Sequence, residues 1–183
     1  MDAELTVELG SDDPTLAVPW QSPDGSVEYV DLRAHPEKIN ELSEVREFPE
    51  LGEFLRALNI GDFATAKCDA WFDTLMDVDD EPYEAKMKCA SYVDLFFIGE
   101  RKLASFAEHE SRAREVVRRL RTGEERPSRV EITVRRAYFG DEAGFYWTIY
   151  VFGYGEDTDN ARKDWGKALQ AVVRAITFPV QQP

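Results

Sequence analysis

Hydrophobic and polar residues alternate along three pairs of segments, with the period of two that is typical of β-strands. Each pair is separated by a short stretch of turn-forming or acidic residues, as expected for a hairpin. In the first turn, Pro23-Asp24-Gly25, proline fixes φ and glycine accepts a positive φ. The predicted pairs are 16–20 with 26–32, 64–76 with 84–98, and 129–139 with 145–155.

Three other segments repeat their apolar residues every three or four positions, which is the period of an amphipathic α-helix. They cover 49–59, 106–121 and 157–177, and a shorter helical segment is expected within 36–45. Ser105 and Glu108 have the spacing of a capping box, and the arginines at the end of the second helix complement its dipole. In the last helix, Gly166 predicts a close approach to the sheet.

This order of hairpins and helices predicts an α+β fold. We expect an antiparallel sheet of about six strands, built from serial ββα units, with the helices packed mainly on one face. Residues 14–178 are interpreted as a single domain, because no linker divides them. Residues 1–13 are expected to form a flexible arm or an edge strand, and residues 179–183 a short tail. From residue 49 onward the order of elements resembles that of small secretion chaperones and some toxin-immunity proteins. This resemblance concerns the fold alone and implies no particular activity.

The charge of the chain narrows the range of partners. Among 183 residues, 36 acidic and 22 basic side chains give a formal charge of −14. Residues 1–99 carry −16 and residues 100–183 carry +2. We therefore predict no nucleic acid and no membrane as a partner. Cys68 and Cys89 lack a CxxC spacing and are predicted to be reduced core thiols of a cytoplasmic protein.

The sequence contains no motif for catalysis, a metal or a cofactor, so we predict none of the three. His109 lacks the second histidine of a zinc-protease helix, and His35 is the only other histidine. We expect His109 to be a solvated residue beside Arg112. The acidic segment 77–82 lacks the glycine and glutamate positions of an EF-hand. Gly-Tyr-Gly at 153–155 lacks a third glycine and precedes acidic residues that would repel a phosphate.

The strongest candidate surface is an aromatic stripe on one face of the predicted hairpins. In the last hairpin, the stripe alternates with core positions and is far more aromatic than a face that meets only water. One interpretation is that the N-terminal arm or the curvature of the sheet buries it. The other is an exposed protein-binding patch, because Tyr, Trp and Arg supply most of the binding energy at interfaces. The candidate protein-binding residues are Trp71, Tyr92, Arg135, Tyr146, Tyr150 and Tyr154.

A second candidate surface is basic. Seven arginines lie between residues 118 and 136. We expect them mainly to complement a helix dipole and to meet the acidic first half of the chain. The alternative is that they bind an acidic or phosphorylated partner.

These patterns predict a non-catalytic, cytoplasmic protein-binding module of an adaptor, chaperone-like or immunity-like kind. Its expected partner is a basic protein or a second copy of the chain in a homodimer. The alternative is a small-molecule-binding protein or small hydrolase-like enzyme with a pocket between sheet and helices. Its carboxylates would come from Asp69, Asp73 and Asp94.

Overall fold

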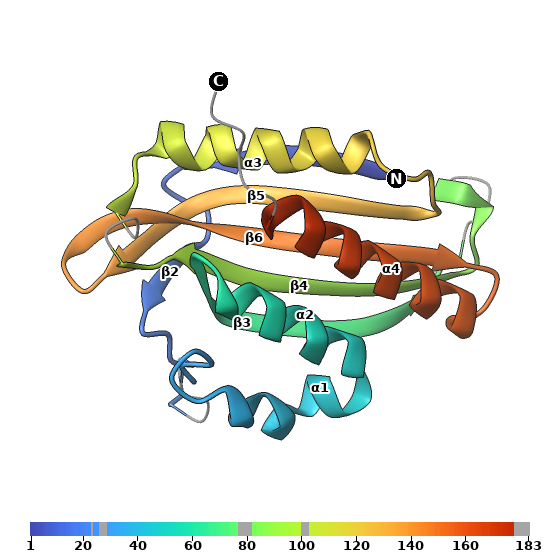
Figure 1. Ribbon diagram of the computed structural model, residues 1–183, viewed down its shortest axis with the longest axis horizontal. Helices are drawn as coiled ribbons and strands as arrows, with labels where there is room; N and C mark the ends of the chain where they lie inside the picture. The colour runs from blue at the N-terminus through green and yellow to red at the C-terminus, as the bar shows by residue number, and fades with distance from the viewer. Residues whose placement is uncertain (23, 26–28, 77–81, 100–102, 178–183) are drawn as a thin grey trace.

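A six-stranded sheet carries three long helices on one of its faces (Figure 1). The computed structural model describes residues 1–22, 24–25, 29–76, 82–99 and 103–177. The elements are β1 (Asp2–Glu8), β2 (Thr15–Val18), the 3-10 helix η1 (Pro36–Glu41), α1 (Ser43–Glu47), α2 (Pro49–Ile60), β3 (Phe63–Thr74), the 3-10 turn η2 (Pro82–Glu84), β4 (Met87–Phe97), α3 (Phe106–Arg121), β5 (Ser128–Phe139), β6 (Glu142–Gly155) and α4 (Thr158–Thr177).

The sheet is mixed, and the predicted antiparallel sheet is in this respect wrong. Its order is β1-β5-β6-β4-β3, and β2 also pairs with β5. The contacts of β6 with β5 and β4, and of β4 with β3, are antiparallel. Both β1 and β2 run parallel to β5, one after the other along the same edge. The α+β class is confirmed.

The two long hairpins are formed as predicted, by β3 with β4 and by β5 with β6. β2 pairs with β5, and residues 26–28 of the first predicted hairpin lie outside the described part of the chain; the Tyr29 amide next to them donates to the Trp20 carbonyl oxygen at 2.9 Å. The scheme of three serial ββα units is therefore not confirmed. β5 lies more than a hundred residues after β1 and β2. Turn signals in the local sequence cannot indicate a pairing over such a distance. Residues 23 and 26–28, the acidic loop residues 77–81 and the tail residues 179–183 lie outside the described part of the chain.

The helix α3 begins with the predicted capping box. The Ser105 hydroxyl accepts a hydrogen bond from the Glu108 amide, and the Glu108 carboxylate accepts one from the Ser105 amide at 2.9 Å. His109, the residue after Glu108, is only 1% exposed, and its ring centroid lies 4.4 Å from that of Phe97. The expectation of a solvated His109 is wrong. It shares the buried stripe of α3 with Ala113, four residues later.

The backbone of α4 lies directly on β6 because two glycines leave room for it. A Cβ atom on Gly153 would lie 2.1 Å from the Trp165 nitrogen, and one on Gly155 would lie 2.5 Å from the Ala161 nitrogen. Gly166 was expected at this contact but lies elsewhere. A Cβ atom on Gly166 would lie 3.5 Å from Glu50 Cγ of α2, which is an ordinary contact distance. The close approach therefore depends on the strand glycines.

The main core lies between the sheet and the helices, where β6 contributes the predicted inward face, Trp147, Ile149 and Val151. Cys89 is buried in this core and Cys68 is half-buried at its edge. Within the described ranges, no helix combines the length and the hydropathy needed to cross a membrane.

Candidate functional site

The face of the sheet opposite the long helices, called the open face below, has side chains from four strands in register. One row crosses it as Arg129, Phe152, Ala90 and Trp71, and the next as Glu131, Tyr150, Tyr92 and Asp69. A third row consists of Thr133, Thr148, Asp94 and Lys67. The first row has Phe152 and Trp71 on either side of Ala90, the second has two adjacent tyrosines in its middle, and the third is polar. The open face thus combines apolar rings with a neighbouring polar row.

A continuous set of hydrogen bonds connects the polar row to the edge of the sheet. Thr148 Oγ1 donates to Asp94 Oδ1 at 2.6 Å and accepts from Arg135 Nη1 at 2.7 Å. Arg135 also donates through Nε to Glu8 Oε2 at 2.7 Å. Asp94, Thr148 and Arg135 are 6%, 1% and 9% exposed. Bonds in such a water-poor place are strong and fix the geometry of the side chains that make them.

Burial dominates the electrostatics of this network. It raises the pKa of Asp94, against the opposing effects of the Thr148 hydrogen bond and of the positive charges of Lys67 and Arg135. It also raises the pKa of Tyr92 to about 12, with smaller contributions from the negative charges of Asp94 and Asp69. Tyr92 therefore keeps its phenolic proton at neutral pH and presents a hydrogen-bond donor as well as a ring.

The aromatic rings beside the network are half-buried and touch one another. The ring centroids of Tyr92 and Tyr150 lie 6.1 Å apart, and those of Tyr150 and Phe152 lie 6.3 Å apart in a stacked arrangement. The Lys88 ammonium group lies 5.7 Å from the Phe152 centroid. Trp71 is also half-buried, and its indole N–H donates to Asp73 at 2.9 Å. The rings of Tyr92, Tyr150 and Phe152 thus contact one another, and a hydrogen bond to Asp73 holds the ring of Trp71.

Both ends of the open face are covered by other parts of the chain. Leu16 packs with Tyr146, which is 2% exposed, and Trp20 lies 4.4 Å from the Lys67 ammonium group across the sheet. At the other end, the Tyr83 ring lies 5.5 Å from that of Tyr154, which is 5% exposed. Tyr146 and Tyr154 are thus structural in the single chain. The available surface lies between them.

The predicted candidate residues therefore divide into two groups. Trp71, Tyr92 and Tyr150 lie on one face and are half-buried. Arg135 is next to them, with its Nη1 atom 3.5 Å from the Tyr150 hydroxyl. Phe152 belongs to the same surface, although it was outside the predicted set. Glu8 was missed as well, and the alternation of Glu4, Thr6 and Glu8 along one strand face was the signal that could have found it.

The carboxylates of the alternative enzyme hypothesis lie in a different place from the one it requires. Asp69, Asp73 and Asp94 are on the open face, whereas that hypothesis places them between the sheet and the helices. No group of three or more His, Cys, Asp or Glu side chains in the described ranges is arranged to hold a metal ion.

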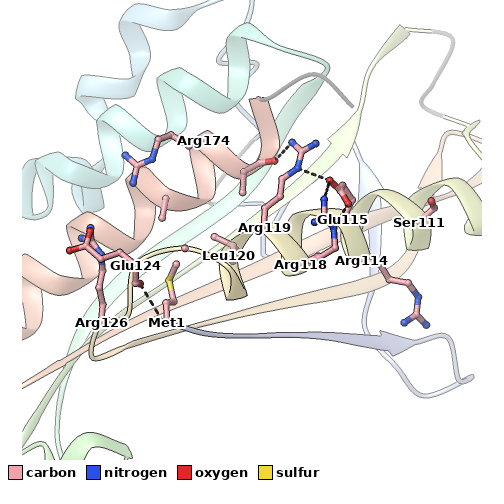
Figure 2. A pocket seen from close by; sticks show the side chains of 13 residues that line it. Met1, Ser111, Arg114, Glu115, Arg118, Arg119, Leu120, Glu124, Arg126 and Arg174 are labelled. Carbon is pink, nitrogen blue, oxygen red and sulfur yellow. Dashed lines mark hydrogen bonds and ion pairs between the residues drawn. The ribbon is translucent and has the colours of Figure 1, made fainter. Parts of the chain in front are cut away.

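A separate groove of about 1060 Å³ lies on the helical side of the molecule, between α3 and α4 (Figure 2). Its lining includes Arg118 and Arg119 of α3 and Arg174 of α4. None of the open-face rings contributes to it. The molecule therefore has two distinct surface features, one aromatic and one rich in arginine.

Comparisons with known protein families, with curated protein sequences and with solved structures give no match to this chain.

Proposed function

We propose that the protein is a non-catalytic, cytoplasmic binding module that recruits a basic partner protein through the open face of its sheet. The observation that carries this proposal is the cluster of half-exposed rings, Trp71, Tyr92, Tyr150 and Phe152, held in place above a buried polar network. Pre-ordered aromatic side chains lose little conformational entropy on binding and are typical of the centres of protein interfaces.

The charges around the rings favour a basic partner. The open face carries more carboxylates than cationic groups: Asp2, Glu4, Glu8, Asp69, Asp73, Asp94 and Glu131 against Lys67, Lys88, Arg129 and Arg135. The whole chain has a formal charge of −14. A second copy would bring the same excess of negative charge to the contact, which disfavours a homodimer. A basic protein would be attracted instead, and the attraction would weaken with salt.

Two half-buried or buried thiols support the cytoplasmic assignment. Cys68 and Cys89 are both free, and burial raises the pKa of each to about 12. Thiols of this kind persist where the surroundings are reducing.

The test is to purify the tagged chain from its native cells and to record native mass spectra at low and moderate salt. We expect a complex with one basic protein that dissociates as the salt rises. Tyr92→Ser with Tyr150→Ser should abolish the complex, because it removes two adjacent rings. Tyr138→Ser is the matched control, since Tyr138 is 44% exposed on the other face of β5. A homodimer, or a complex that survives the double change, would contradict the proposal.

A further inference from the structure

Five arginines line the groove between α3 and α4, although the chain as a whole is acidic. They are Arg114, Arg118, Arg119, Arg126 and Arg174, and the acidic lining residues are Glu115 and Glu124. The side chains that line the groove thus carry a formal charge of +3, in a chain whose formal charge is −14. Such local segregation creates a positive potential that a net charge does not reveal.

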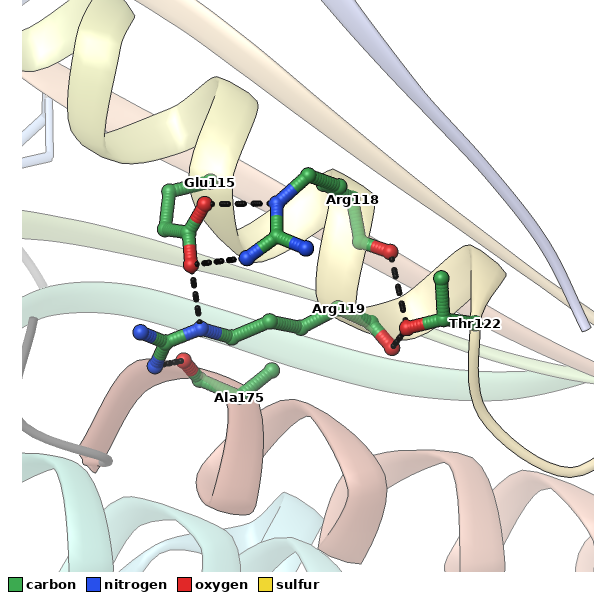
Figure 3. A network of polar contacts seen from close by, with 5 residues as sticks. All are labelled: Glu115, Arg118, Arg119, Thr122 and Ala175. Atoms are coloured by element: carbon green, nitrogen blue, oxygen red, sulfur yellow. Dashed lines mark hydrogen bonds and ion pairs between the residues drawn. The ribbon is translucent and has the colours of Figure 1, made fainter. Parts of the chain in front are cut away.

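A single carboxylate holds two of these arginines in fixed positions (Figure 3). Glu115 accepts from Arg118 Nε at 2.8 Å and Nη2 at 2.6 Å, and from Arg119 Nε at 2.7 Å. These hydrogen bonds lower the pKa of Glu115 to about 2. Arg119 Nη1 also donates to the Ala175 carbonyl oxygen at 3.1 Å, which connects α3 to α4. The Glu115 carboxylate is thus shared between the two guanidinium groups.

Two further arginines carry charge on exposed side chains at the rim. Arg174 is exposed on α4 and makes no ion pair within the described part of the chain. The Arg114 side chain is 68% exposed, and its pair with Glu110 at 2.6 Å is a surface i,i+4 contact that contributes little stability. A ligand can therefore engage both arginines at little cost to the fold.

The groove also has apolar surface. Leu120, Ala171, Ala175 and the half-buried Met1 line it together with the arginines. A ligand that fits must combine negative charge with a small aliphatic side chain. Nucleic acid and inorganic phosphate lack this aliphatic component.

We infer that this groove binds an acidic peptide segment of a partner protein. Its carboxylates would pair with Arg114, Arg118 and Arg174, and an aliphatic side chain would pack on the half-buried Met1 and Ala171. Guanidinium–carboxylate pairs of this type are strong and directional. This site is independent of the open face and has the opposite charge preference.

The experiment is fluorescence anisotropy with a labelled peptide of about twelve residues, two-thirds Glu and one-third Leu, titrated with the full chain. We expect saturable binding at about 50 mM salt that weakens about tenfold or more at about 300 mM, because the contacts are charge pairs near the surface. Arg114→Glu combined with Arg174→Glu should weaken binding by a further factor of about ten or more. Arg136→Glu, an exposed arginine outside the groove, is the matched control and should change the affinity less than about twofold.

Four results would overturn the inference. They are the absence of saturable binding at low salt, equal weakening by Arg136→Glu, equal affinity for a peptide with Lys in place of Glu, and tighter binding of an oligonucleotide through the same arginines. If the double variant fails to fold in a circular-dichroism melt, Arg174→Gln alone provides the test, because it removes one exposed charge. Tyr150→Ser should leave peptide binding unchanged, which separates this site from the open face.

Discussion

Arg135 and Asp94 are bridged by one hydroxyl group, that of Thr148, beside the aromatic rings of the open face. The two hydrogen bonds of this hydroxyl measure 2.7 and 2.6 Å. Since all three residues are buried, water cannot replace a bond that is lost. Tyr150 lies at the border of this bridge, with its hydroxyl 3.5 Å from Arg135 Nη1. The position of the Tyr150 ring therefore depends on the hydrogen bonds of Arg135, Thr148 and Asp94.

Thr148→Val tests the contribution of the bridge. Valine keeps the shape of threonine and removes the hydroxyl, which leaves the buried Asp94 and Arg135 groups without their shared partner. We expect the free energy of unfolding to fall by about 1–3 kcal/mol, as measured by urea denaturation. The control is Thr133→Val, a buried position on the same row, for which a loss of about 0.5 kcal/mol or less is expected. Equal losses in both variants would show that the bridge adds nothing.

The raised pKa of Asp94 predicts a pH dependence of stability. In the unfolded chain the pKa returns to about 3.9. Because the folded pKa is higher, the stability contributed by Asp94 is fully present below the unfolded pKa and is lost as the pH rises through the folded pKa. Asp94→Asn removes this ionisation. The free energy of unfolding of Asp94→Asn, minus that of the unaltered protein, should therefore increase as the pH rises from about 4 to about 7.

Urea unfolding at a series of pH values measures this difference. Asp69→Asn, at an exposed position in the neighbouring row, is the control and should show a much smaller trend. Two curves for Asp94→Asn and the unaltered protein that stay parallel would contradict the assignment of Asp94 as a buried, destabilised carboxylate.

Gly153→Ala should be strongly destabilising. Its methyl group would lie 2.1 Å from the Trp165 nitrogen and 2.4 Å from the Ala161 carbonyl oxygen, so α4 would have to move away from β6. We expect a loss of about 3 kcal/mol or more in thermal or urea unfolding. Gly166→Ala is the matched substitution inside α4. It meets ordinary contact distances and should stabilise the helix by about 0.5–1 kcal/mol. A larger loss of stability in Gly166→Ala than in Gly153→Ala would contradict the close contact of Gly153 with α4.

The two thiols should be protected from alkylation. With their pKa values raised to about 12, Cys68 and Cys89 have very little thiolate at pH 8. Iodoacetamide should therefore react about a thousandfold more slowly with the folded chain than with the chain in urea. Peptide mass spectrometry of each cysteine gives the two rates. Rapid labelling of Cys89 in the folded protein would show that the core opens at α4.

Local sequence signals predicted much of the architecture. The capping box at Ser105 and Glu108 located α3, and strict alternation located the core face of β6. The same alternation placed Trp71, Tyr92, Tyr150 and Arg135 on one face. These features depend on neighbours within a few residues, so that periodicity is sufficient to find them.

The features that were missed depend on contacts between distant parts of the chain. The parallel pairing of β1 with β5 joins residues more than a hundred positions apart, and no turn signal precedes it. The burial of Tyr146 comes from Leu16, and that of Tyr154 from Tyr83. His109 is buried because Phe145 and Trp147 of β6, as well as Phe97 of β4, lie against it. Periodicity gives the face of a side chain but not what covers that face.

Photo-cross-linking in the native cells tests the central claim, that the open face binds a basic partner, most directly. Tyr150→benzoylphenylalanine places the reactive group on the open face, and Tyr138→benzoylphenylalanine places it on the other face of β5. We expect one covalent adduct with a basic protein from position 150, reduced by high salt, and none from position 138. Equal labelling from both positions, or an adduct of two copies of the chain from position 150, would contradict it.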